Sequence, residues 1–153
     1  MKVRDLMTRD VISVRRETSV NEVAKLMHRH AVSGLPVLGD RGEIAGIITE
    51  LDLIVRNGRL EMPLFLQIFD ASIPLELPGH LRHRLRHALG TRAEDVMTPG
   101  VHSVGPDAGV EELVKLMVGS GANPVPVVEH GELVGIVSRS DIIRMMSAEL
   151  GEG

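Results

Sequence analysis

The sequence predicts a mixed α/β (α+β) fold made of two tandem β-α-β-β-α repeats that are related by a pseudo-twofold axis. Residues 3–37 align without a gap with residues 93–127, and 13 of the 35 pairs are identical. Residues 42–54 align in the same way with residues 131–143, with 6 of 13 pairs identical. One such unit cannot bury its apolar face alone, so we expect the two copies to pack against each other.

The first copy supplies each element of this pattern in order. Thr18 or Ser19 can cap a helix, Ser19 and Glu22 have the spacing of a capping box, and the apolar residues that follow recur at helical spacing. Gly34 and Pro36 introduce an apolar run that ends at a glycine-containing turn. We therefore predict a strand over 11–14, a helix over 19–30, a strand over 34–38, a hairpin turn over 39–42, a strand over 44–48 and a helix over 49–58.

The second copy repeats the same order. We predict a strand at 103–104, a helix over 109–119, a strand over 125–128, a turn over 129–131, a strand over 132–137 and a helix over 139–148. Neither copy has more than three strands, and such a small sheet leaves one face uncovered. Pairing of the two sheets and their helices covers these faces.

The segment between the copies has no counterpart in either repeat. The predicted divisions are residues 1–55 for the first repeat, 56–91 for an inserted connector, 92–148 for the second repeat and 149–153 for a C-terminal tail. Within the connector, residues 79–89 have the pattern of an amphipathic helix. His80, His83 and His87 share one face of it, but three arginines crowd the same helix, so a solvated basic helix is the simpler interpretation. A metal-responsive or nucleic-acid-responsive regulator that uses residues 79–92 remains an alternative.

The composition excludes several classes of function. A net charge of −4 argues against a general nucleic-acid binder, and the chain has no cysteine for a disulfide, a thiolate nucleophile or a zinc-thiolate site. No apolar run approaches the length of a membrane span and no secretory leader is recognisable, so we expect no membrane partner and a cytoplasmic location. Catalytic motifs such as HExxH, a nucleophile elbow or a glycine-rich phosphate loop with its lysine are also missing, so we expect no enzyme.

The residues that could bind a ligand lie where a strand passes into a helix. The pattern is Gly-Ile-Ile-Thr-x-x-Asp at 46–52 and Gly-Ile-Val-Ser-x-Ser-Asp at 135–141. The glycine permits close approach by another backbone, and a hydroxyl at a helix N-terminus favours an anion such as phosphate. The aspartate one turn later can accept two hydrogen bonds from a ribose diol. The same pattern also resembles a helix cap, and both interpretations remain open.

Taken together, these motifs resemble the CBS domain. The resemblance rests on Asp5-Leu6-Met7-Thr8, on the run from Met27 to Val37 and on Gly46-Ile47-Ile48-Thr49-x-x-Asp52, and it extends to their equivalents in the second copy. Two such domains in tandem are similar to the paired CBS (Bateman) module. This family implies a regulatory module without a required cofactor, which binds AMP, ADP, ATP or S-adenosylmethionine in two clefts between the repeats.

In that family each cleft takes its base pocket from one copy and its hydroxyl-x-x-Asp from the other. Carried onto this chain, the first cleft joins Val11, Ile12, Val32, Ser33 and Gly34 to Ser138, Ser140 and Asp141. The second cleft joins Val101, His102, Ala122, Asn123 and Pro124 to Thr49 and Asp52. Additional positive charge would come from Arg29, His30 and Arg139 in the first cleft, and from His102 and Arg56 in the second.

The two clefts differ in one hydroxyl group. Leu51 occupies the position that matches Ser140, so the second cleft has one phosphate donor fewer. A hydrogen bond to a charged group is worth roughly 1.5–3 kcal/mol, and we therefore expect the Asp141 cleft to bind more tightly.

The resemblance also implies how the module acts. Such modules pair into flat, disc-like homodimers, with helices 19–30, 49–58, 109–119 and 139–148 as the contacts. Because the repeats consume nearly the whole chain, any output passes through the homodimer or through an unidentified effector protein. A purely structural or interaction module with empty clefts is the alternative.

Overall fold

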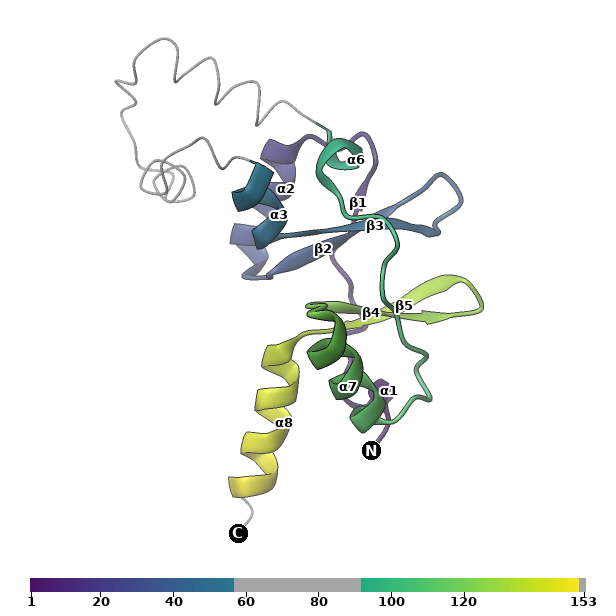
Figure 1. Cartoon of the computed structure of the whole chain (residues 1–153), viewed down its shortest axis with the longest axis vertical. Coiled ribbons are helices and arrows are strands. Elements are labelled where there is room, and N and C mark those ends of the chain that lie inside the picture. The colour runs from purple at the N-terminus through teal and green to yellow at the C-terminus, as the bar shows by residue number, and fades with distance from the viewer. Residues whose placement is uncertain (57–91, 152–153) are drawn as a thin grey trace, which may run out of the picture.

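The computed structural model describes residues 1–56 and 92–151, which form two bodies stacked one above the other (Figure 1). The first body contains a three-stranded sheet in the order β1-β2-β3, and the second contains the pair β4-β5. The strands are β1 (Val14–Arg15), β2 (Gly34–Leu38), β3 (Ile44–Thr49), β4 (Val125–Glu129) and β5 (Glu132–Val137). The longer helices are α2 (Val20–His30), α3 (Glu50–Arg56), α7 (Val110–Ser120) and α8 (Arg139–Gly151). The fold class predicted from the sequence is confirmed.

Helix α2 begins and ends where its sequence places the signals. The Ser19 hydroxyl accepts a hydrogen bond from the Glu22 backbone N–H at 3.2 Å, which satisfies one of the free amides of the first turn. Ala31 ends the helix in the left-handed conformation, at φ 51°. The face at helical spacing, which includes Val20, Val23 and Met27, is buried against the sheet. Burial of this face, rather than helix propensity, holds an 11-residue helix in place.

The two hairpins are built alike. In the first, β2 and β3 pair antiparallel from Gly34 opposite Thr49, and the register shifts between Val37 and Leu38. In the second, β4 and β5 pair in the same way, and the shift falls at the equivalent Val127/Val128. The first strand of each repeat is shorter than predicted: β1 has two residues, and in the second body a single parallel bridge joins Val104 to Val127.

Two differences from the predicted elements concern the chain ends and the connector. Helix α8 continues to Gly151, through residues that the sequence assigned to a tail. The helix predicted over residues 79–89 and its three histidines lie outside the described residues.

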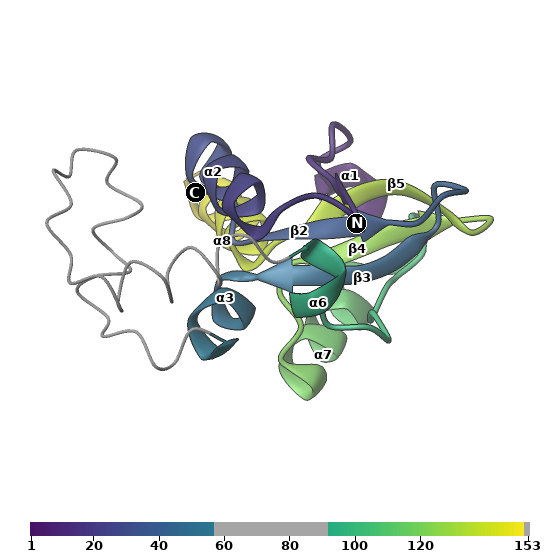
Figure 2. The same ribbon diagram turned by 90° about the horizontal axis from the view of Figure 1, so that it is seen from above.

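Each repeat begins with a leader segment that crosses to the other body, and the sequence did not reveal this exchange. The leaders carry the short helices α1 (Val3–Leu6) and α6 (Ala93–Val96). Helix α1 contacts α8 and β5, whereas α6 contacts α2, α3 and β3. Figure 1 shows α1 in the lower body and α6 in the upper one, and Figure 2 shows α1 beside β5 and α6 beside β3. Backbone N–H groups of Val3 and Ala93 donate across the exchange to the carbonyls of Ala108 (2.9 Å) and Thr18 (2.7 Å).

Beyond these helices, each leader pairs with the edge of the other body's sheet. The Thr8 N–H donates to the Ile136 carbonyl at 2.9 Å, and the Ile136 N–H donates back at 3.0 Å. Thr98 and Ile47 form the equivalent pair, at 2.8 and 3.0 Å. A leader in this position satisfies backbone groups that an edge strand would otherwise expose.

The exchange completes both hydrophobic cores. Val3 and Met7 belong to the core of the second body, where Val3 is fully buried. Ala93 and Val96 belong to the core of the first body. Because each core contains side chains from the other repeat, separation of the two bodies would open both cores.

Two equivalent glycines allow the leaders to lie this close. A Cβ atom on Gly46 would lie 2.6 Å from Met97 Sδ and 3.0 Å from the Thr98 carbonyl oxygen. A Cβ atom on Gly135 would lie 2.5 Å from Met7 Sδ. The expectation that this glycine admits another backbone is confirmed at Gly46, where the backbone is that of the exchanged leader. At Gly135 the nearest leader atoms belong to the Met7 side chain.

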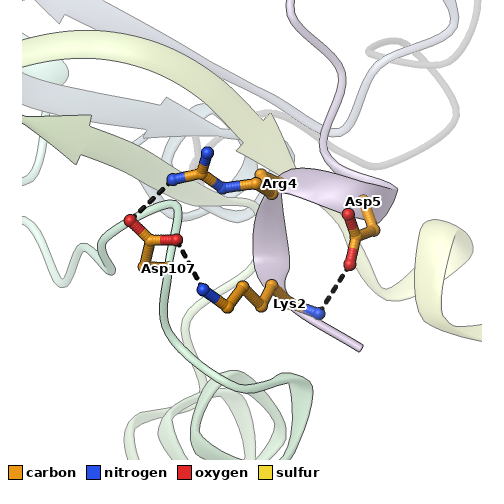
Figure 3. Close-up of polar contacts among 4 residues, drawn as sticks. All are labelled: Lys2, Arg4, Asp5 and Asp107. Atoms are coloured by element: carbon orange, nitrogen blue, oxygen red, sulfur yellow. Dashed lines mark hydrogen bonds and ion pairs between the residues drawn. The ribbon is translucent and has the colours of Figure 1, made fainter.

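The N-terminal leader is also held by charge (Figure 3). Asp107 accepts from Lys2 Nζ at 2.8 Å and from an Arg4 guanidinium nitrogen at 2.6 Å, while the Lys2 N–H donates to Asp5 at 2.8 Å. The hydrogen bond from Lys2, with the nearby Arg4 charge, holds the pKa of the Asp107 carboxyl below its ordinary 3.8. In the described part of the chain no ion pair ties the other leader to the first body, because Arg92 instead faces Glu94 at 3.6 Å.

Substitution of either buried glycine should loosen the exchange. We expect Gly46→Ala and Gly135→Ala each to lower the free energy of unfolding by about 1–3 kcal/mol, because the methyl group overlaps a methionine and, at Gly46, also a leader carbonyl. Urea unfolding followed by circular dichroism measures this. Gly119→Ala in α7 is the control, since its Cβ meets nothing within 4 Å, and we expect stability unchanged or raised by up to ~1 kcal/mol. Wild-type stability of both test variants would contradict this account.

The Asp107 cluster should contribute a small, pH-dependent stability. The pKa of Asp107 is lower in the folded chain, so its contribution is present above 3.8 and is lost as the pH falls through the lowered pKa. We expect Asp107→Asn to lower the melting temperature slightly at pH 7, because the side chains are about half exposed, and the gap to wild type to close below pH 3.8. Asp40→Asn, whose partner Arg15 is 4.0 Å away, should match wild type throughout. A gap that persists unchanged at pH 3 would rule out the ion pairs as its source.

Candidate functional site

Two cavities with walls from both repeats flank the line where the bodies meet. The larger, about 450 Å³, is here called the Asp52 cavity, and the smaller, about 350 Å³, the Asp141 cavity. The Asp52 cavity is lined by Thr49, Leu51 and Asp52 from the first repeat and by Val101, His102, Ala122, Asn123, Pro124 and Arg139 from the second. The Asp141 cavity is lined by Ile12, Val32, Ser33 and Gly34 from the first repeat and by Ser138, Ser140, Asp141 and Arg144 from the second. Both volumes lie within the range of small-molecule sites.

The structure brings the residues of each predicted cleft together, with one exception. Every residue predicted for the second cleft lines the Asp52 cavity. In the Asp141 cavity all predicted residues except Val11 are present. Leu51 lines one cavity and Ser140 the other, as expected from their equivalent positions.

The charged residues require a correction. Arg139, predicted for the first cleft, lines the Asp52 cavity instead. Its backbone N–H donates to Asn123 Oδ1 at 2.9 Å and its guanidinium lies 3.4 Å from the Gly121 carbonyl oxygen, so the side chain stays beside its own repeat. His30 and His102 line the predicted cavities, whereas Arg29 lines neither. The Arg56 side chain lies outside the described part of the chain.

Both aspartates accept hydrogen bonds at the start of their helices. At Asp52 the capping box is complete, since the Asp52 N–H also donates to the Thr49 hydroxyl at 3.3 Å, whereas the Asp141 N–H donates to the Ser138 carbonyl at 3.1 Å. Asp141 Oδ2 accepts from the Ser138 N–H at 2.7 Å and from its hydroxyl at 2.8 Å. Asp52 Oδ2 accepts from the Thr49 N–H at 2.9 Å and from its hydroxyl at 3.1 Å. The helix-cap interpretation of the motif is therefore realised in both copies. It does not exclude ligand binding, because a carboxylate has about four lone-pair sites and each cap uses one oxygen.

The second carboxylate oxygen has a different partner in each copy. Asp52 Oδ1 accepts from the hydroxyl of Thr98, which belongs to the exchanged leader, at 2.9 Å. Asp141 Oδ1 instead pairs with Arg144 on its own helix at 3.1 Å, and Asp141 is only 8% exposed. A ligand hydroxyl at Asp52 would therefore compete with a contact between the two repeats, whereas one at Asp141 would compete with a local ion pair.

The two cavities share a wall. Ser33, Glu50 and Pro124 line both of them. Gly34 and Pro124 are equivalent residues that face each other, and a Cβ on Gly34 would lie 2.7 Å from Pro124 Cδ. A bulkier residue in place of Gly34 would thus push the two repeats apart at this wall.

Sequence reasoning missed several lining residues, among them Asp10 and Arg144 of the Asp141 cavity. Thr8 lines the Asp141 cavity and Thr98 the Asp52 cavity, Glu50 lines both, and Pro124, predicted for the Asp52 cavity, also lines the Asp141 cavity. The threonines had a detectable signal, since Asp-x-Met-Thr is retained in both copies. Glu50 had none, because its equivalent is an arginine.

The sequence model of the CBS domain matches residues 3–57 and 93–148. The chain therefore belongs to the CBS domain family, and the resemblance found in the sequence is confirmed. It is similar to the uncharacterized protein MJ1426 of Methanocaldococcus jannaschii, with 31% identity over 95% of this chain and 91% of that protein. An inosine-5′-monophosphate dehydrogenase of Korarchaeum cryptofilum is also 31% identical over 92% of this chain, but the chain spans only 23% of that enzyme.

Solved structures share the fold. CBSX2 in complex with AMP superposes with a TM-score of 0.71 at 24% identity, covering 96% of each chain. The CBS domain pair of protein MJ0100, in complex with 5′-methylthioadenosine and S-adenosyl-L-methionine, superposes with a TM-score of 0.72 at 23% identity, covering 95% of this chain and 99% of that one. At these identities the likeness establishes the architecture.

Residues 1–56 and 92–151 contain neither a candidate membrane span nor a candidate metal cluster. None of their helices is both long enough and apolar enough to cross a membrane. The same residues gather no group of three or more histidine, cysteine, aspartate or glutamate side chains that could hold a metal ion.

Proposed function

We propose that this chain is a regulatory module that senses adenine nucleotides or related adenosyl compounds in the Asp52 and Asp141 cavities. The observation that carries this proposal is the composition of the cavities: each combines apolar residues of one repeat with a hydroxyl and an aspartate of the other. A ligand that fills such a cavity contacts both repeats at once, so its binding energy acts on their relative position.

The lining fits the parts of an adenosyl ligand. Branched and small apolar residues, such as Val32 with Ile12 and Val101 with Ala122, offer flat contact for a purine in a chain without Trp or Tyr. The aspartate at each helix start can accept from a ribose diol. Hydroxyl groups beside the helix N-terminus, as at Ser138 and Ser140, suit the 5′ substituent.

Related structures support the ligand class. CBSX2 was solved with AMP, and the MJ0100 domain pair with 5′-methylthioadenosine and S-adenosyl-L-methionine. We extend this class to AMP, ADP, ATP and S-adenosylmethionine for this chain. The bound molecule is a signal rather than a resident cofactor, and the role is regulatory rather than catalytic.

The exchanged leaders connect ligand binding to a change of conformation. Thr98 joins the second repeat's leader to Asp52 inside the larger cavity, at 2.9 Å. A ribose hydroxyl that donates to Asp52 Oδ1 displaces the Thr98 hydroxyl and weakens one link between the second repeat's leader and the first body. The resulting change of conformation or association is passed to an effector protein or to a second copy of the chain.

Association into a homodimer forms part of this proposal. Large apolar side chains are exposed on three helices: Leu51 and Ile54 on α3, Val118 on α7, and Ile143, Met146 and Leu150 on α8. The three on α8 recur at helical spacing and form one stripe, in which Ile143 is 63% and Leu150 78% exposed. Of the helices predicted as contacts, α2 exposes no large apolar side chain.

Isothermal titration with AMP, ADP, ATP and S-adenosylmethionine tests the sensor. We expect saturable heat with at least one of them, and Asp52→Asn and Asp141→Asn should each weaken binding at one cavity by about tenfold or more, because a hydrogen bond to a charged acceptor is lost. Asp107→Asn, which removes a carboxylate away from both cavities, is the matched control. Thermal unfolding of each variant shows whether its helix cap survives. Absence of heat at millimolar ligand would refute the sensor and favour a structural module with empty clefts.

Light scattering coupled to size exclusion tests the association. We expect a species of twice the 16.6 kDa chain mass, and Ile143→Glu should shift it toward the monomer because a charge in an apolar contact is costly. Arg41→Glu, in the exposed turn of the first hairpin, changes charge without touching the helices and should leave the mass unaltered. A wild-type chain that remains monomeric at high concentration would argue against the homodimer.

A further inference from the structure

The two cavities differ most in the charges that line them. The Asp52 cavity has the carboxylates of Glu50 and Asp52 together with Arg139, and His102 lies at its wall. The Asp141 cavity has the carboxylates of Asp10, Glu50 and Asp141 together with Arg144, and His30 lies at its wall. One arginine thus faces two carboxylates in the first cavity and three in the second.

The two arginines are not equally available to a ligand. Arg144 lies 3.1 Å from Asp141 Oδ1, so its charge is already compensated inside the cavity. Arg139 pairs with no carboxylate of the described residues, and its guanidinium contacts only a carbonyl oxygen, that of Gly121, at 3.4 Å. In contrast, no cation of residues 1–56 and 92–151 pairs with Asp10 or Glu50. Both cavities therefore contain carboxylates without a cation partner, but only the Asp52 cavity also has an arginine that no carboxylate of the described residues compensates.

A phosphate group distinguishes strongly between these linings. A phosphate monoester carries close to two negative charges at neutral pH, and guanidinium binds it through paired, charge-assisted hydrogen bonds. In the Asp141 cavity, where Arg144 is already paired and does not offset Asp10 and Glu50, the same group is repelled, and the repulsion strengthens as ligand binding expels water. A neutral thioether or a cationic sulfonium at the 5′ position meets no such repulsion.

The hydroxyl count does not outweigh these charges. Ser140 is the hydroxyl that the Asp141 cavity has in place of Leu51. A serine hydroxyl both donates and accepts, so it also serves a neutral polar ligand. From the charges we expect the opposite ranking to the one predicted from the sequence for phosphate-bearing ligands.

We propose that the two cavities bind different classes of adenosyl ligand at the same time. The Asp52 cavity takes an adenine nucleotide, with Arg139 as the residue that selects for phosphate. The Asp141 cavity takes an adenosyl compound without phosphate, such as a 5′-thioether or sulfonium. This assignment rests on the proposed function and adds that the chain reports on two signals, through cavities that share the wall of Ser33, Glu50 and Pro124.

Titration calorimetry of the full chain with AMP and 5′-methylthioadenosine tests the partition. In wild type we expect AMP to bind at one site per chain whether or not the thioether is present at saturation. Ala122→Phe, which fills the base side of the Asp52 cavity, should abolish the AMP signal and keep the thioether signal. Val32→Phe at the equivalent position of the Asp141 cavity should do the reverse.

Substitution at Arg139 tests the selecting charge. Arg139→Gln should weaken AMP binding by about tenfold or more and leave 5′-methylthioadenosine binding unchanged. Arg139→Lys, which keeps the charge, should recover part of the AMP affinity. Arg29→Gln on α2 removes the same charge outside both cavities and should behave as wild type. Asp10→Asn should permit a second AMP to bind, in the Asp141 cavity.

The outcomes separate the two proposals. Competition between AMP and the thioether for one cavity, or unchanged AMP affinity in Arg139→Gln, would overturn the partition and leave the sensor intact. Failure of wild type to bind either ligand would overturn both. Thermal unfolding shows whether the phenylalanine variants are folded. If they are not, the Arg139 variants alone test the partition.

Discussion

The exchange of leader segments between the repeats is the constraint on which the rest of this structure depends. Thr8 pairs with Ile136 and Thr98 with Ile47, so each sheet is extended by the other repeat's chain. Val3 and Met7 then enter one core, and Ala93 and Val96 the other. A β-α-β-β-α unit has too few strands to close its own core, and the exchange solves this for both copies at once. It also holds the two repeats close enough to form cavities between them.

The same two aspartate side chains cap the helices and line the cavities. Asp52 and Asp141 each use one carboxylate oxygen to cap a helix and hold the other toward the cavity partners, Thr98 and Arg144. The cap fixes the carboxylate in one orientation, which reduces the conformational entropy that a ligand must otherwise remove. Stability and recognition are therefore not competing interpretations of this motif, because each uses a different oxygen of the same side chain.

Duplication produced two equivalent frames, and later substitutions made them unequal. Glu50 and Arg139 occupy equivalent positions at the start of α3 and α8 and carry opposite charges. Their backbone N–H groups donate to residues at equivalent positions, to the Ser33 carbonyl and to Asn123 Oδ1, so the frame is similar while the charge differs. Charge acts over several ångströms in a partly desolvated cavity, so on our proposal one such difference selects the ligand without altering the fold.

The sequence by itself determined the element order, the Ser19 cap, the two hairpins and the pairing of one repeat's apolar wall with the other repeat's hydroxyl and aspartate. The first three follow from local periodicity and from the alignment of the copies, whereas the pairing across the clefts is what the resemblance to the CBS domain implies. Only the tertiary structure decided the leader exchange, the cavity of Arg139 and the shared wall at Glu50 and Pro124. Each depends on contacts between segments far apart in sequence, and no local pattern encodes which body a short leader will join. Arg139 shows the limit: its type is readable from the sequence, but the Asn123 and Gly121 contacts that direct it exist only in the folded chain.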